Sequence, residues 1–132
     1  MFRVRSMTTA KTILVCDDDE LLVDLLDYRL TGRGFEVLIA RDGGQALAIA
    51  AERTPDAIVL DAMMPVLDGH QVLRRLRADA ATSTIPVIML TARKLERDIV
   101  GALELGANDY LVKPFIPEEL MSRLTRLMAA PR

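Results

Sequence analysis

Residues of a type that can bind metals and phosphate follow four short apolar segments of this chain. Asp17 and Asp18 follow residues 12–16, Asp61 follows 57–60, Thr91 follows 86–90, and Lys113 follows 110–112. Carboxylates brought together repel one another, which raises their pKa values unless a cation neutralises them. Oxygen ligands of this kind suit Mg²⁺, which takes one or two carboxylates directly and keeps several waters. These residues therefore predict a magnesium site, provided that the fold brings them together.

The same residues predict phosphoryl transfer to a carboxylate. Beside a bound cation, one carboxylate can remain ionised and act as a nucleophile toward phosphorus. The transferred group also needs positive charge and hydrogen-bond donors near its oxygens, which the ion, Lys113 and Thr91 would supply. Asp19 is better explained as the N-cap of a following helix, because Asp is favoured at that position.

The apolar segments predict the elements that position this set. They lie at residues 12–16, 36–40, 57–60, 86–90 and 110–112, and stretches with helical periodicity separate them. Strands that are apolar throughout indicate a parallel sheet with helices on both faces, so the fold class is α/β. We expect the fourth helix at 95–105 and the fifth at 118–128, with Pro117 in a favourable first-turn position. In such doubly wound sheets, ligands bind beyond the carboxyl ends of the strands.

Length and composition predict one globular domain that would lie in the cytoplasm. The chain has 132 residues, 51% of them hydrophobic and 27% charged, which fits one packed core. The net charge of −2 argues against direct binding to nucleic acid or to an anionic membrane. The single cysteine cannot form an internal disulfide, and neither a signal peptide nor an apolar run of about 20 residues is present. We expect a flexible N-terminal segment at 1–10, the domain at 11–128, and a tail or linker start at 129–132.

Four segments resemble the signature blocks of response-regulator receiver domains. They are ILVCDDD at 13–19, DAMMPVLDG at 61–69, LTA at 90–92 and GANDYLVKPF at 106–115, and the similarity extends from about Lys11 to Met128. The resemblance implies a flavodoxin-like sheet of five parallel strands in the order 2-1-3-4-5 with five helices. It also implies a role in two-component signal transduction, in which a sensor histidine kinase or a phosphotransfer protein donates the phosphoryl group.

The resemblance assigns a role to each site residue. Asp61 would accept the phosphoryl group, Asp18 would bind Mg²⁺ directly, and Asp17 would bind it mainly through water. The backbone carbonyl of Met63 would also bind the ion. Lys113 would pair with Asp61 and then with its phosphoryl group, and the Lys113–Pro114 peptide bond would be cis.

Thr91 and Tyr110 form the switch that this resemblance implies. A phosphoryl oxygen on Asp61 would accept a hydrogen bond from Thr91 and draw its loop inward. The ring of Tyr110 would then turn into the vacated space. This movement would change the surface made by the fourth helix, the fifth strand and the fifth helix.

The last third of the chain resembles the OmpR/PhoB-type transcription regulators, which implies a phosphorylation-dependent symmetric homodimer through that surface. The implied contacts are an apolar centre of Val100, Leu103 and Met121, and Asp109 opposite Arg123 of the second copy. One ion pair of that subfamily is lost, because Ile99 stands where a basic residue would face Glu119.

Two alternatives remain open at this point. A phosphatase resembling the haloacid dehalogenases would use Asp17 as its nucleophile, but it would leave residues 61–65 without a role and has no segment for a cap. A module that has the receiver fold but no phosphorylation would not need the complete set of polar residues. His70 is more simply a solvated helix residue and Cys16 a core residue. Met63 and Arg93 would flank the water that hydrolyses the phosphoryl group, and we expect slow hydrolysis because Met63 cannot orient that water.

Overall fold

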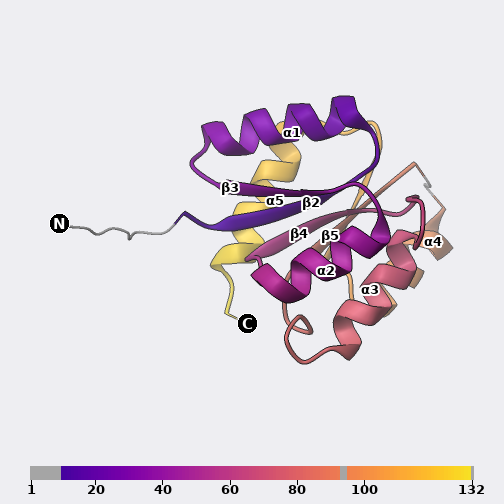
Figure 1. The fold of residues 1–132 in the computed structure, drawn as a ribbon. Coiled ribbons are helices and arrows are strands. Elements are labelled where there is room, and N and C mark those ends of the chain that lie inside the picture. Colours follow the sequence, from indigo (N-terminus) through magenta and orange to yellow (C-terminus); the bar gives the residue numbers. More distant parts are fainter. Residues whose placement is uncertain (1–9, 93–94, 132) are drawn as a thin grey trace.

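Strands and helices alternate in the computed structural model, which describes residues 10–92 and 95–131 (Figure 1). The strands are β2 (Thr12–Cys16), β3 (Glu36–Ala40), β4 (Ala57–Asp61), β5 (Val87–Thr91) and β6 (Asp109–Val112). The helices are α1 (Glu20–Gly32), α2 (Gly43–Arg53), α3 (Gly69–Ala78), α4 (Glu96–Glu104) and α5 (Pro117–Ala129).

The predicted elements all exist, and the bounds predicted for the five strands and the last two helices differ from the observed ones by one residue at most. Asp61 and Thr91 are the last residues of β4 and β5, whereas we expected them just beyond the strands. Helix α4 is one residue shorter at each end than predicted, and α5 is one residue longer at each end. The predicted N-terminal segment, apart from Ala10, lies outside the described residues.

The five strands form one parallel sheet in the order β3-β2-β4-β5-β6, which is the predicted order 2-1-3-4-5 in chain sequence. The chain runs outward from β2 to β3 and then returns to place β4 on the other side of β2. The carboxyl ends of β2 and β4 therefore flank the point where strand order reverses, the usual place for a ligand in this fold class.

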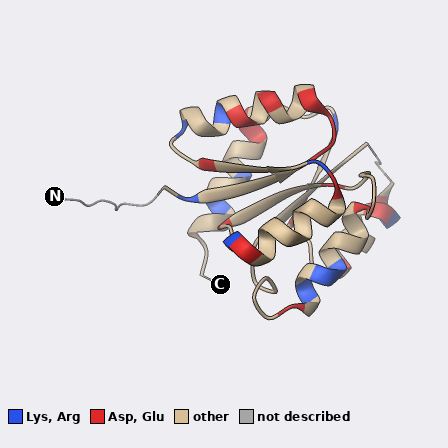
Figure 2. Ribbon diagram, viewed as in Figure 1, with Lys and Arg blue, Asp and Glu red and all other residues tan. Residues whose placement is uncertain are grey.

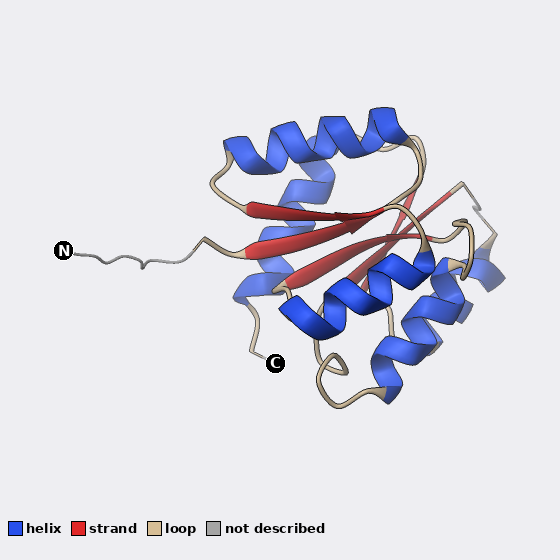
Figure 3. Cartoon of the chain, viewed as in Figure 1, coloured by secondary structure: helices blue, strands red, loops and turns tan. Residues whose placement is uncertain are grey.

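Helices cover both faces of the sheet, with α1 and α5 on one face and α2, α3 and α4 on the other (Figure 3). Alternate strand residues supply the two cores, as the period of a strand requires. Ile13 and Val15 pack with α1 and α5, whereas Leu14 and Cys16 pack on the α2 side. None of the helices in the described ranges combines the length and apolar character that crossing a membrane would require.

Candidate functional site

Three carboxylates meet at the carboxyl ends of β2 and β4. Asp17 and Asp18 directly follow β2, and Asp61 ends β4. Each offers an oxygen that lies within 4.8 Å of an oxygen from the other two. Asp17 and Asp61 are 1% and 5% exposed, whereas Asp18 is exposed. The fold thus assembles the predicted cluster, and its donors are all oxygens, as Mg²⁺ requires.

Lys113 connects the two buried carboxylates. Its Nζ lies 3.0 Å from Asp17 Oδ2 and 3.3 Å from Asp61 Oδ1. The second oxygen of Asp17 accepts a hydrogen bond from the Asp19 backbone N–H at 3.0 Å. The side chain of Asp19 accepts from the Leu21 and Leu22 amides and caps α1, as predicted. The Lys113–Pro114 peptide is cis, as the resemblance implied.

The cluster is electrostatically unfavourable for Asp61 as a free carboxylate. Burial, together with the neighbouring charge of Asp17, raises the pKa of Asp61 to about 6, although Lys113 and a hydrogen bond from the Met63 backbone oppose this rise. Burial alone would lower the pKa of Lys113, but its hydrogen bonds and charge interactions with Asp17 and Asp61 outweigh burial and leave that pKa raised. Lys113 is therefore a permanent cation here, and one cation does not fully balance the three acids.

The loop between β4 and α3 packs closely against its neighbours. A Cβ atom at Gly69 would lie 2.4 Å from the Asp61 carbonyl oxygen, and one at Gly43 would lie 2.2 Å from the Leu67 carbonyl oxygen. Val66 has a φ of 71°, and the Leu67 amide donates to the Pro65 carbonyl at 2.8 Å, which makes a γ-turn. The supporting roles of Gly43, Gly69 and Val66 were not predicted from the sequence. For Gly69, its position directly after Asp68, the N-cap residue of α3, was the only sequence feature that pointed to a structural role.

The predicted switch residues lie on neighbouring strands. Thr91 is 1% exposed and ends β5, directly after Leu90, which pairs with Asp61 in the sheet. Tyr110 pairs with Met89 and is half-buried against the core on the α2, α3 and α4 side. Arg93, the predicted shield of the phosphoryl group, lies outside the described residues.

Comparison with known proteins identifies the family. The family described as "Response regulator receiver domain" matches residues 13–125. This chain belongs to that family. The receiver is 47% identical over 118 residues to the alkaline phosphatase synthesis transcriptional regulatory protein PhoP of Bacillus subtilis, covering 89% of this chain and 48% of that protein. It is 45% identical over 117 residues to the DNA-binding response regulator MtrA of Mycolicibacterium smegmatis, covering 89% and 50%.

These relatives are OmpR/PhoB-type regulators, as the resemblance implied, and the chain spans about half of their length. Among solved structures, it is similar to the receiver domain of sensor histidine kinase PA1611 from Pseudomonas aeruginosa PAO1, which holds a magnesium ion in its active site cleft. That match has a TM-score of 0.85 and 35% identity, and it covers 92% of this chain and 100% of the other. The chemotaxis response regulator CheY4 of Vibrio cholerae gives 0.85 and 33%, with 90% and 99% covered. Membership in this family argues against the haloacid-dehalogenase-like phosphatase.

The residues predicted for a dimer face divide between surface and interior of the receiver. Val100 and Leu103 are 43% and 44% exposed on α4, in keeping with that prediction, but Met121 is 1% exposed. Met121 packs between α5 and the sheet, so in this conformation it is not accessible to a second copy, and its place in the apolar centre of a dimer stays a prediction. Helical period alone did not show which side of α5 faces inward.

Arg123 has partners within its own chain. Its guanidinium lies 2.7 Å from Asp109 and 2.8 Å from Glu119 of the same receiver. The predicted pairing of Asp109 with Arg123 of a second copy would therefore require this internal pair to exchange partners.

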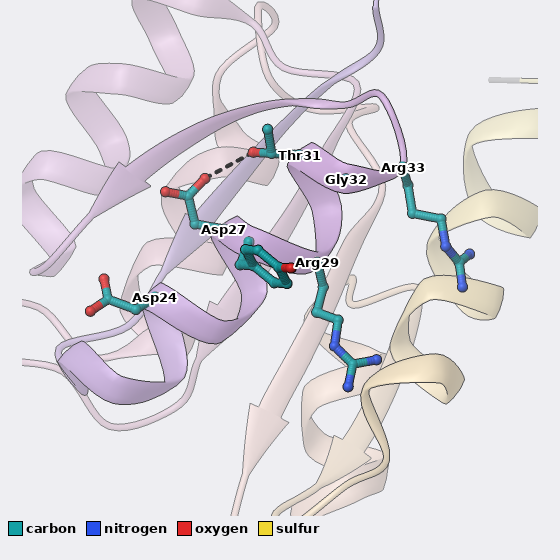
Figure 4. Close-up of a pocket in the computed structure, with 7 residues that line it drawn as sticks. Asp24, Asp27, Arg29, Thr31, Gly32 and Arg33 are labelled. Atoms are coloured by element: carbon teal, nitrogen blue, oxygen red, sulfur yellow. Dashed lines mark hydrogen bonds between the residues drawn. The ribbon is translucent and has the colours of Figure 1, made fainter.

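A shallow concavity on the outer side of α1 is separate from the acidic cluster. Figure 4 shows its lining, where Thr31 donates a hydrogen bond to Asp27 and the side chains of Arg29 and Arg33 extend away from that pair. Both arginines form ion pairs with Glu118 of α5. These ion pairs tie α1 to α5.

Cys16 is fully buried, as predicted for a core residue. Burial raises the pKa of its thiol, and the charge of Asp17 raises it further. The thiolate is therefore not populated near neutral pH, and Cys16 is not a nucleophile of this site.

Proposed function

We propose that this receiver accepts a phosphoryl group on Asp61 in a magnesium-dependent reaction and acts as a regulatory switch rather than as an enzyme with a separate substrate. The observation that carries the proposal is the bridge from Lys113 to both Asp17 and Asp61, with Asp18 completing the cluster. A half-buried lysine between two acids provides positive charge at the place where phosphoryl oxygens would arrive.

The donor set fits Mg²⁺, because all its members are oxygens and a net negative charge persists beside Lys113. Asp18 and Asp61 would bind the ion directly, Asp17 mainly through water, and Met63 through its backbone carbonyl. Bound Mg²⁺ would neutralise the carboxylates and the charge of the phosphoryl oxygens. The related PA1611 receiver, which holds magnesium in its cleft, supports this choice.

The side chains of this chain would then share the work of transfer. A carboxylate oxygen of Asp61 attacks the donor phosphorus, and the bond between phosphorus and the phosphohistidine nitrogen of a sensor histidine kinase or phosphotransfer protein breaks. Lys113, held by Asp17, shifts its hydrogen bond from the Asp61 carboxylate to a phosphoryl oxygen. The receiver would promote only its own phosphorylation and dephosphorylation.

Thr91 and Tyr110 would report the new group to the surface. The Thr91 hydroxyl donates to a phosphoryl oxygen, and the half-buried ring of Tyr110 turns further inward. The exposed apolar side chains of Val100 and Leu103 lie on the surface that this movement would alter. We infer that this surface then favours a symmetric dimer.

The output would be transcription through a DNA-binding partner domain in the cytoplasm. The relatives named above are transcriptional and DNA-binding regulators about twice the length of this chain. The net charge of −2 argues against DNA binding by the receiver itself, at residues 11–128.

Intact mass measurement with Mg²⁺ and acetyl phosphate tests the proposal. We expect a gain of about 80 Da in the unmodified protein and none in Asp61→Asn. Asp24→Asn, an exposed acid on α1, is the matched control and should be modified normally. An adduct that persists in Asp61→Asn would contradict the assignment of Asp61. The complete absence of an adduct in the unmodified protein would favour the phosphorylation-independent module.

A further inference from the structure

Arg77, in the last turn of α3, donates hydrogen bonds to two separate loops. Its Nε and Nη2 donate to the Gly106 carbonyl at 3.0 and 2.9 Å, and Nη2 also donates to Asn108 Oδ1 at 3.0 Å. Its Nη1 donates to the carbonyls of Ile85 at 2.8 Å and Ser83 at 3.1 Å. These acceptors lie in the segment between α3 and β5 and in the turn between α4 and β6.

All of these acceptors are neutral oxygens. Within residues 10–92 and 95–131, the hydrogen bonds of the Arg77 guanidinium go to carbonyl and side-chain amide oxygens, and burial lowers its pKa. Arg74 and Arg75, on the same helix, are exposed. Figure 2 shows the basic positions of α3 in blue. A guanidinium offers five N–H groups spread over a planar fork, so it can reach acceptors in two separate loops, whereas an ammonium group offers three N–H groups on one nitrogen. The contacts of Arg77 therefore hold backbone in place rather than balance charge.

The contacts hold the C-terminal end of α4 against the start of β5. Asn108 Oδ1 also accepts from the Val87 amide at 2.8 Å, and the Asn108 amide donates to the Val87 carbonyl at 2.8 Å. Gly106 has a φ of +112°, and a Cβ atom there would lie 2.9 Å from Arg77 Cγ. The turn after α4 is thus shaped to receive this arginine.

Helix α4 is held unevenly along its length. Ala102 is its only buried residue, and Ala107, just beyond the helix, is also buried. At the other end Glu96 and Arg97 are exposed, and the N-cap residue Leu95 makes no side-chain capping hydrogen bond. The weakly held end is the one that follows the Thr91 loop in the chain.

We propose that Arg77 is a positioning residue that makes the C-terminal end of α4 a fixed pivot, so that the response to phosphorylation is confined to the N-terminal turns of this helix. The inference rests on the proposed function, because it takes phosphorylation of Asp61 and movement of the Thr91 loop as its input. Arg77 itself lies on the far end of α3 from Asp61 and does not enter the chemistry. The arrangement converts a movement near Thr91 into a tilt of α4.

Hydrogen exchange measured by mass spectrometry tests the pivot in the ligand-free protein. In Arg77→Lys, we expect amides at 82–87 and 105–108 to exchange about tenfold faster or more, because hydrogen bonds are lost at both loops. Amides at 12–40 should exchange as in the unmodified protein. Arg74→Lys is the matched control on the exposed side of α3 and should change neither region. Unchanged exchange at 105–108 in Arg77→Lys would overturn the inference.

The second arm adds Mg²⁺ and beryllofluoride, which mimics the phosphoryl group. In the unmodified protein we expect exchange to change at 96–101 but not at 102–108, and in Arg77→Lys we expect the change to spread into 102–108. If Arg77 were only a structural anchor without a role in switching, the change in exchange in Arg77→Lys would remain confined to 96–101. An equal change in exchange along 96–108 in the unmodified protein would overturn the pivot but not the proposed function.

Two further experimental results would also decide between these explanations. If beryllofluoride changes exchange nowhere in the unmodified protein, the proposed function fails and the role of Arg77 in switching fails with it. If circular dichroism shows that Arg77→Lys is unfolded, Asn108→Ala, which removes one partner of Arg77 and of the Val87 amide, is judged by the same boundary.

Discussion

Replacing Asp61 by asparagine should stabilise the metal-free receiver at neutral pH, although it removes the proposed phosphorylation site. The pKa of Asp61 rises from an ordinary 3.8 to about 6 in the folded protein because the carboxylate is buried and lies beside Asp17. The folded state therefore disfavours ionised Asp61 relative to the unfolded chain. Asparagine has nearly the same shape and carries no charge, so it removes this penalty.

The magnitude and its pH dependence follow from linkage. A difference between 3.8 and about 6 corresponds to about 3 kcal/mol at pH 7 and above, where Asp61 is ionised in both states. Below the ordinary pKa it is protonated in both states, and the penalty disappears. The variant should thus be more stable than the unmodified protein by about 1 to 3 kcal/mol at pH 7.5, with the lower bound allowing for the lost bond to Lys113. The advantage should shrink as pH falls from 7 toward 4.

Urea unfolding followed by far-ultraviolet circular dichroism suits this protein, which has no tryptophan. Mg²⁺ should reverse the order, because it stabilises the unmodified protein more than Asp61→Asn. Asp24→Asn, an exposed acid outside the cluster, is the control and should show neither effect. A variant that is less stable than the unmodified protein at pH 7.5, or a difference that does not change with pH, would refute this reasoning.

Three further predictions concern the loop, the lifetime and the dimer. Val66→Gly should raise the free energy of unfolding, measured with urea, by about 1 kcal/mol, because the φ of 71° at Val66 disfavours a β-branched residue and the side chain is 76% exposed. A lower free energy of unfolding would contradict backbone strain at Val66. Met63→Asn should shorten the half-life of the phosphorylated protein several-fold in a mass time course, because an amide can orient the attacking water, and an equal or longer half-life would contradict this. Leu103→Glu should raise the dissociation constant of the beryllofluoride-dependent dimer about tenfold or more in light scattering, whereas Leu21→Glu, at an 82% exposed site on α1, should leave it unchanged. An unmodified protein that stays monomeric with beryllofluoride would rule out the dimer.

The fold and the acidic cluster were accessible from local patterns. Strand and helix periodicity depend on neighbours along the chain, and a parallel sheet brings all carboxyl ends of its strands to one edge. Residues directly after different strands, such as Asp17 and Lys113, must therefore lie near one another once the fold class is known. The structure bears this out with the 3.0 Å bridge between their side chains.

Only the tertiary structure decided which groups the long arginine side chains contact and which sides of α4 and α5 are buried. Helical period places Val100, Leu103 and Met121 on stripes, but packing against the sheet decides that Met121 is buried while the other two are exposed. An arginine can reach many acceptors, so nothing local predicts that Arg123 pairs with Asp109 of its own chain. The same holds for Arg77, whose acceptors come from loops up to 31 residues away and meet only when α3, α4 and β5 have packed together.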